Sequence, residues 1–176
     1  MPSTSTNNMT AACACGQVAL QLNGKPIVCL ACYCDDCQRG SRRIETLPHA
    51  QPVLDPDGGT AYVLYRKDRV ECVQGAPLLQ RHKLDERSAT YRVVAHCCDS
   101  ALYMGFDDAR QWVPVYRARI DSGKAPPLQM RICTKFKPEG SRIPDDVNSH
   151  RGYPLGFLAR LFAAWVPMLL QRPRPA

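Results

Sequence analysis

The sequence predicts a mainly β protein of small antiparallel sheets with one helix near its C-terminal end. Short apolar runs separated by turn-forming residues follow one another from residue 17 to residue 106, and no segment before about Leu155 shows a helical period. At 176 residues the chain is about one domain and can bury most of its surface. We therefore expect a disordered polar leader over 1–10, a β domain over 11–150, and an apolar helix with a basic tail over 151–176.

The first strands are expected in a hairpin. Residues 17–22 place large apolar side chains two apart, as a half-buried strand requires. Asn23-Gly24 follows, and an Asn-Gly step between apolar runs favours a hairpin because both residues accept positive φ. Residues 27–30 would then be the returning strand. Further short strands are expected over 60–66, 70–73, 90–95 and 102–106.

The segment after Pro154 has the spacing of a helix. The apolar residues that recur at helical intervals are Leu155, Leu158, Phe162, Trp165 and Leu169. No transmembrane segment is predicted, because spanning a bilayer takes about 20 apolar residues and Arg160 and Pro167 interrupt this run. We expect the helix to dock on the domain or on a second copy, which would make a homo-oligomer. An interfacial membrane anchor is the alternative.

Ten cysteines give the strongest chemical signal. Cys32, Cys34 and Cys37 form a C-x-C-x-x-C run, and thiols so spaced on a bent loop can converge on one cation at about 2.3 Å. Residues 1–10 lack the basic start and apolar stretch of a secretory signal, so we expect a cytoplasmic location. Thiols stay reduced there, and metal binding is a commoner use of cysteine than disulfides. The sequence therefore predicts zinc, as one or two ions.

Two more cysteine groups complete a pattern. Cys13-Ala14-Cys15-Gly16 lies near the start, and Cys97-Cys98 lies directly before a small-x-Leu-Tyr strand. These motifs, in this order around C-x-C-x-x-C, resemble the glutathione-dependent formaldehyde-activating (GFA) family, which includes the centromere protein V domain. The resemblance covers roughly residues 13–106. It implies a fold of packed antiparallel sheets, described as a zinc-bound β-tent, with two zinc sites.

The resemblance gives these two sites different roles. Cys13 and Cys15 would join Cys98 and one further ligand in a closed structural site, since four ligands complete the zinc tetrahedron. The middle motif, Cys32 to Cys37, would hold the second zinc through three thiolates and leave one position for a substrate sulfur or water. An open position is typical of catalytic zinc.

The third motif departs from the family pattern C-x-x-C-G. Ala95 stands where its first cysteine is expected, and Asp99 stands at the glycine. Cys97 is the expected substitute, because a thiolate keeps the site all-sulfur. His96 is the alternative, since side chains two apart on an extended backbone share a face with Cys98. An incomplete first site is a third possibility.

The middle motif leaves a second choice of ligand. Cys29 would turn it into a closed four-thiolate site, or else it is a buried strand cysteine. Cys72 and Cys133 stand alone and are expected in the core. Tyr33 replaces the histidine that the family often has, and a phenol offers no base near neutral pH. Arg39 and Arg42 are the expected substrate-binding residues, because Arg suits the two carboxylates of glutathione.

Together these observations favour a zinc-dependent carbon–sulfur lyase or synthase acting on glutathione and formaldehyde or a related thiol adduct. The alternative is a non-catalytic zinc module that binds protein or nucleic acid, which a net charge of +7 would allow. The basic residues are scattered, with no basic helix or block, so specific nucleic-acid recognition is not indicated. A redox or metal sensor built on exposed thiolates is a third hypothesis.

Overall fold

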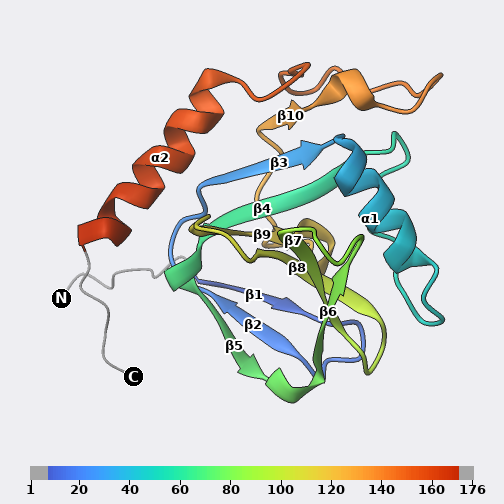
Figure 1. Cartoon of the computed structure of the whole chain (residues 1–176), viewed down its shortest axis with the longest axis vertical. Helices are drawn as coiled ribbons and strands as arrows, with labels where there is room; N and C mark the ends of the chain where they lie inside the picture. Colours follow the sequence, from blue (N-terminus) through green and yellow to red (C-terminus); the bar gives the residue numbers. More distant parts are fainter. Residues whose placement is uncertain (1–7, 171–176) are drawn as a thin grey trace.

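The computed structural model describes residues 8–170, which form two β-sheets and two α-helices (Figure 1). The strands are β1 Met9–Ala12, β2 Ala19–Leu22, β3 Val28–Cys32, β4 Thr60–Arg66, β5 Val70–Gln74, β6 Leu79–Lys83, β7 Thr90–Ala95, β8 Ser100–Phe106, β9 Trp112–Tyr116 and β10 Met130–Ile132. The helices are α1 Asp35–Glu45 and α2 Leu155–Leu170, with short 3₁₀ segments at Lys67–Arg69, Ala76–Leu78, Arg117–Arg119 and Thr134–Phe136. A mainly β fold with small sheets and a C-terminal helix is thus confirmed.

The sheets differ in size and lie on different levels of the molecule. A three-stranded sheet has the order β1-β2-β5, and a seven-stranded sheet has the order β10-β3-β4-β9-β8-β7-β6. All pairings are antiparallel except that of β10 with β3, which is parallel. In Figure 1 the smaller sheet lies at the bottom, α2 at the upper left and α1 at the right.

The seven-stranded sheet is buried on both faces. Along β4 the side chains alternate, so that Tyr62 and Leu64 face one core while Val63 and Tyr65 face the other. The first core also contains residues of α1 and α2, and the second contains the apolar residues of the small sheet. Both cores are therefore organised around this sheet.

Four predicted strands are confirmed as β4, β5, β7 and β8, but the hairpin is wrong. Strand β2 pairs with β1 and β5, whereas β3 pairs with β4 and β10. Gly24 does have positive φ, at +73°. The chain diverges around it, because the Asn23 amide bonds to Arg69 at the small sheet while the Ile27 amide bonds to Leu64 of β4. The turn therefore carries the chain from one sheet to the other.

Helix α1 was not predicted, and the expectation of no helix before Leu155 is wrong. Its buried face is mostly polar or small, comprising Cys37, Gln38, Gly40, Ser41 and Ile44, so the sequence shows no apolar period there. Asp35 and Asp36 lie in the first turn, where carboxylates complement the helix dipole, and two arginines lie in the last turn. The missed signal was this placement of charge.

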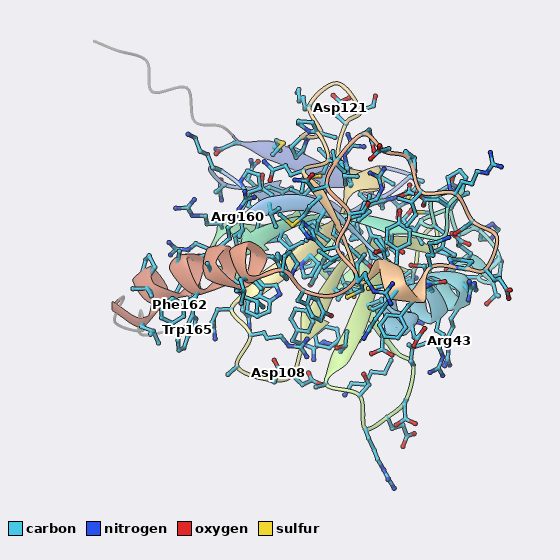
Figure 2. The ribbon with its side chains drawn as sticks, turned by 90° about the horizontal axis from the view of Figure 1, so that it is seen from above. Arg43, Asp108, Asp121, Arg160, Phe162 and Trp165 are labelled. Atoms are coloured by element: carbon cyan, nitrogen blue, oxygen red, sulfur yellow. The ribbon has the colours of Figure 1, made fainter. Side chains whose placement is uncertain are left out.

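Helix α2 has the predicted extent but docks by a different face. Phe157 and Leu161 are buried against the large sheet, while Leu155 is 84% exposed and Phe162 is 62% exposed. Figure 2 shows Phe162 and Trp165 on the part of α2 that lies away from the sheets. Neither described helix is long and apolar enough to cross a membrane. Residues 1–7 of the expected leader and 171–176 of the expected tail lie outside the described residues, and β1 begins at Met9.

Candidate metal centres and an adjoining cavity

The first cysteine group joins the two sheets. Cys13 and Cys15 follow β1, and Cys97 and Cys98 form the turn between β7 and β8. The Sγ atoms of Cys13 and Cys15 are 3.5 Å apart, and Cys15 Sγ is 3.4 Å from Cys97 Sγ. All four Sγ atoms lie within 4.8 Å of one another. Sulfurs in a tetrahedral thiolate site lie about 3.8 Å apart, so this group could hold a metal ion.

The turn that carries Cys97 and Cys98 depends on Asp99. Asp99 has φ of +52°, the left-handed region in which aspartate is one of the better-tolerated residues after glycine. Its carboxylate accepts a hydrogen bond from the His49 amide at 3.1 Å. Asp99 thus adopts the backbone conformation that the family's glycine would favour. Of the two alternatives for the fourth ligand, Cys97 lies in the group, whereas His96 is exposed and does not.

Hydrogen bonds make the thiols of the first group unequal. Burial and hydrogen bonds with neighbouring thiols raise the pKa of Cys97 to about 12. Burial also acts to raise the pKa of Cys98, but hydrogen bonds with Ser100 and Cys15 outweigh it and lower the pKa to about 6. Neighbouring thiolates repel one another, so full ionisation of the group requires a cation among them.

The second group lies at the start of α1. Cys32 ends β3, Cys34 is the N-cap of α1, and Cys37 lies in its first turn. Their three Sγ atoms lie within 4.8 Å of one another, so this group too could hold a metal ion. The N-terminal end of a helix stabilises negative charge, which favours thiolates at this position.

One sulfur of the second group is a thiolate at neutral pH. Hydrogen bonds from Cys32 and Cys37 lower the pKa of Cys34 to about 3, and the charge of Arg92 contributes in the same direction. Hydrogen bonds with Cys133 and Cys34 raise the pKa of Cys32. A hydrogen bond with Cys32 acts to lower the pKa of Cys37, but Cys34 and complete burial raise it overall. The remaining two sulfurs therefore keep their protons.

A fourth thiol, Cys133, lies beside this group. It directly follows β10, whose parallel pairing with β3 places Ile132 opposite Cys32. Cys133 is buried in the first core, as expected, but its thiol also hydrogen-bonds with Cys32 and Tyr153, which lowers its pKa to about 7. The Cys133 sulfur does not lie within 4.8 Å of all three sulfurs of the second group. This neighbour could not be predicted from the sequence because it depends on a long-range parallel pairing.

Cys29 and Cys72 lie away from both groups. Cys29 is buried in the core between the sheets, and its thiol donates to the Pro126 carbonyl at 3.5 Å. Because successive strand residues face opposite sides, Cys29 points away from the face on which Cys32 lies. Cys72 on β5 packs at the margin of the same core. The closed site that Cys29 would complete is therefore not formed.

A cavity of about 300 Å³ adjoins the second group. Cys32, Cys34 and Cys37 all line it, while Cys133 does not. Its other walls are mainly apolar side chains of the large sheet and of α2; they include Leu30, Leu64, Met104, Trp112, Phe157 and Leu161. The volume is at the lower end of the range typical of small-molecule sites. Helix α2 thus forms one wall of a pocket at whose edge the three sulfurs lie.

Arg92 on β7 lines the same cavity and was not predicted as a functional residue. Its side chain is 2% exposed, and its Nη2 donates to the Asp36 carbonyl of α1. Nε and Nη1 have no hydrogen-bond partner among residues 8–170. The available sequence signal was an arginine directly before the apolar pair Val93-Val94 in a strand. Such a position indicates a buried side chain, and a buried charge needs a partner.

One family model and one solved structure are similar to this chain. The family model described as glutathione-dependent formaldehyde-activating enzyme matches residues 8–49, which contain the cysteines from Cys13 to Cys37. The chain is therefore similar to this family over residues 8–49. Cys97 and Cys98 lie outside the matched GFA segment. A search of curated proteins gave no match. A crystal structure of a Rhodobacter sphaeroides protein is similar, with 16% identity, a TM-score of 0.46 and coverage of 65% of this chain and 89% of that one.

Within the GFA segment, the residues expected to bind substrate do not line the cavity. Arg39 and Arg42 are exposed on α1, and Arg42 donates to Gln38 at 3.1 Å. Tyr33 also faces elsewhere. Its hydroxyl donates to Asp57 at 2.6 Å and accepts from Arg131 at 3.2 Å. Burial raises the pKa of Tyr33, so this phenol links neighbouring segments and supplies no base.

Proposed function

We propose that Cys32, Cys34 and Cys37 bind zinc and leave one coordination position open to the cavity, where a thiol adduct is formed or cleaved. The reaction would be that of a carbon–sulfur lyase or synthase, acting on glutathione and formaldehyde or on a related thiol and aldehyde. The observation that carries the proposal is that all three sulfurs line the cavity. An incoming ligand would reach them without displacing a protein side chain.

The donor set fits zinc, since soft thiolates at this spacing select Zn²⁺ over the harder cations. When bound there, zinc would lower the pKa of an incoming thiol and polarise an aldehyde oxygen. The three cysteines serve as permanent ligands and not as nucleophiles.

The first group would hold a second, structural zinc. Four thiolates close a tetrahedron and leave no position for a substrate. The metal would join the loop after β1 in the small sheet to the turn between β7 and β8 in the large one, so its role would be to hold the two sheets together. This arrangement separates a closed site from an open one in a single domain.

The test is turnover by the zinc-loaded protein. The rate at which a thiol, either glutathione or a more apolar one, combines with formaldehyde to form the S-hydroxymethyl adduct should rise above the uncatalysed rate in proportion to protein concentration, and Cys34→Ser should abolish the increase. The matched control is Cys72→Ser, which removes a thiol outside both groups. The proposal would be refuted by a protein that contains zinc at the second group yet neither binds a thiol nor changes this rate.

A second candidate function, a non-catalytic zinc module, is favoured by Cys133. Its thiol already hydrogen-bonds with Cys32. A modest movement of the loop after β10 would bring a fourth sulfur to the metal and close the site. The exposed side chains of Leu155, Phe162 and Leu169 on α2 would then be a surface for a protein partner or a second copy of this chain. Analytical ultracentrifugation of wild type and Phe162→Asp tests self-association.

A further inference from the structure

We propose that the cavity beside the second group binds a thiol with an apolar body and one anionic group, and that Arg92 pairs with this anion. The inference rests on the proposed function in taking the ligand to be a thiol, and it goes further by naming its class. It also assigns to Arg92 a binding role that the sequence pattern gave to Arg39 and Arg42.

The guanidinium of Arg92 is incompletely paired. Burying a guanidinium is costly unless its charge is paired and its N–H groups are bonded. Among the described residues Arg92 makes no salt bridge, and its one hydrogen bond goes to a backbone carbonyl of Asp36. Buried polar groups in folded proteins are nearly always satisfied, so a guanidinium with two unpaired nitrogens is short of partners. Because Arg92 lines the cavity, an anion bound there would offset its charge.

The other cation of the cavity already has a partner. Arg110 also lines it, but its guanidinium forms a two-pronged pair with Asp108, with Nη2 to Oδ2 at 2.6 Å and Nε to Oδ1 at 2.8 Å. It also stacks over the Phe106 ring at 3.7 Å. The charge of Arg110 is therefore already offset, and an anionic ligand would pair with Arg92.

The remaining walls of the cavity are mainly apolar. Leucine, methionine, tryptophan and phenylalanine side chains from β3, β4, β8, β9 and α2 form most of the surface. A ligand such as glutathione, with two carboxylates and two amides, would leave several polar groups without partners against these walls. An alkyl or aryl body is the complementary shape, because its burial is favourable and demands no hydrogen bonds.

The experiment compares two matched thiols on the zinc-loaded full chain. Mercaptohexanoate carries one carboxylate, and mercaptohexanol has the same apolar body without the charge. Isothermal titration calorimetry should show the carboxylate binding about tenfold or more tightly, which corresponds to about 1.4 kcal/mol. In Arg92→Met this preference should disappear while the affinity for mercaptohexanol stays within about threefold. Arg92→Lys should keep part of the preference, and the surface variant Arg87→Met should keep all of it.

Three outcomes would overturn the inference. The wild type could bind both thiols equally, Arg92→Met could retain the preference, or both affinities could fall together, as expected for a purely structural arginine. The comparison of the two thiols on the wild-type protein tests the inference even if Arg92→Met fails to fold. Hexanoate, which has no sulfur, separates this inference from the proposed function. If neither thiol reaches the metal but hexanoate still perturbs the amide signals of the cavity in NMR titrations and loses this effect in Arg92→Met, the proposed chemistry fails while the anion site stands.

Discussion

Gly40 of α1 and Arg92 of β7 occupy adjacent space so closely that no side chain fits between them. A Cβ built on Gly40 would lie 2.1 Å from Arg92 Nε and 2.2 Å from its Cζ. The guanidinium is thereby held against the first turns of α1, where its Nη2 donates to the Asp36 carbonyl. The glycine therefore fixes the position of the one unpaired cation in the described part of the cavity.

Gly40→Ala should accordingly destabilise the protein although alanine is the better helix former. Displacing a buried guanidinium should outweigh the gain in helix propensity, and we expect a net loss of about 1–3 kcal/mol in the free energy of unfolding. Chemical denaturation measures it. The matched control is Gly156→Ala on α2, where a new Cβ meets nothing within 4 Å, so this variant should be neutral or slightly stabilised. Equal effects of the two changes would contradict the close packing of Gly40 and Arg92.

Cys97 and His96 should differ in their effect on metal content. Cys97 Sγ lies 3.4 Å from Cys15 Sγ, whereas His96 is exposed outside the group. Cys97→Ser should lose about one zinc per chain and lower the melting temperature, because the link between the two sheets is lost. His96→Ala should change neither. Loss of zinc in the histidine variant alone would show that the backbone turn selects the other ligand.

Metal binding at the second group should release two protons near pH 7. Cys34 is already a thiolate because its pKa is about 3, whereas Cys32 and Cys37 have raised pKa values and must each lose a proton to coordinate. Zinc affinity should therefore rise with pH across the neutral range and weaken as the solution is acidified. Calorimetry in buffers of different ionisation enthalpy counts the protons, with Cys97→Ser used to isolate this group. Release of no protons would contradict these ionisation states.

Cys133→Ser should leave the zinc content unchanged if the second group is open. The serine hydroxyl can still bond to Cys32 and Tyr153, so the fold should be retained with a loss of no more than about 1 kcal/mol. Elemental analysis and thiol titration measure the outcome. A fall of one zinc per chain would instead identify Cys133 as the fourth ligand and would support the non-catalytic module.

The order of the cysteine motifs could be predicted because metal ligands repeat at short, recognisable spacings. Cys32 to Cys37 lie within six residues, and their convergence needs only a local bend at the start of a helix. The neighbours of this group could not be predicted in the same way. Cys133 reaches it through the parallel pairing of β10 with β3, and Arg92 reaches it from β7. Neither contact leaves a local pattern in the sequence.

The strands could be predicted from local sequence, whereas their pairing partners could not. Short apolar runs bounded by turn residues marked β4 and β7 correctly, since such a run depends on the sequence of one strand alone. The partner of β2 was wrong because Asn23-Gly24 indicates a turn but not which sheet the chain enters next. Helix α1 was missed since it buries glycine, serine and glutamine in place of an apolar stripe.

The central claim, that the second group holds zinc with one exchangeable position facing the cavity, is tested most directly by X-ray absorption at the zinc edge. Cys97→Ser, which keeps only the second site, should show three sulfurs and one lighter ligand around zinc. Adding a thiol should replace the lighter ligand with a fourth sulfur at about 2.3 Å. Four sulfurs before any thiol is added, falling to three in the double variant with Cys133→Ser, would contradict the account.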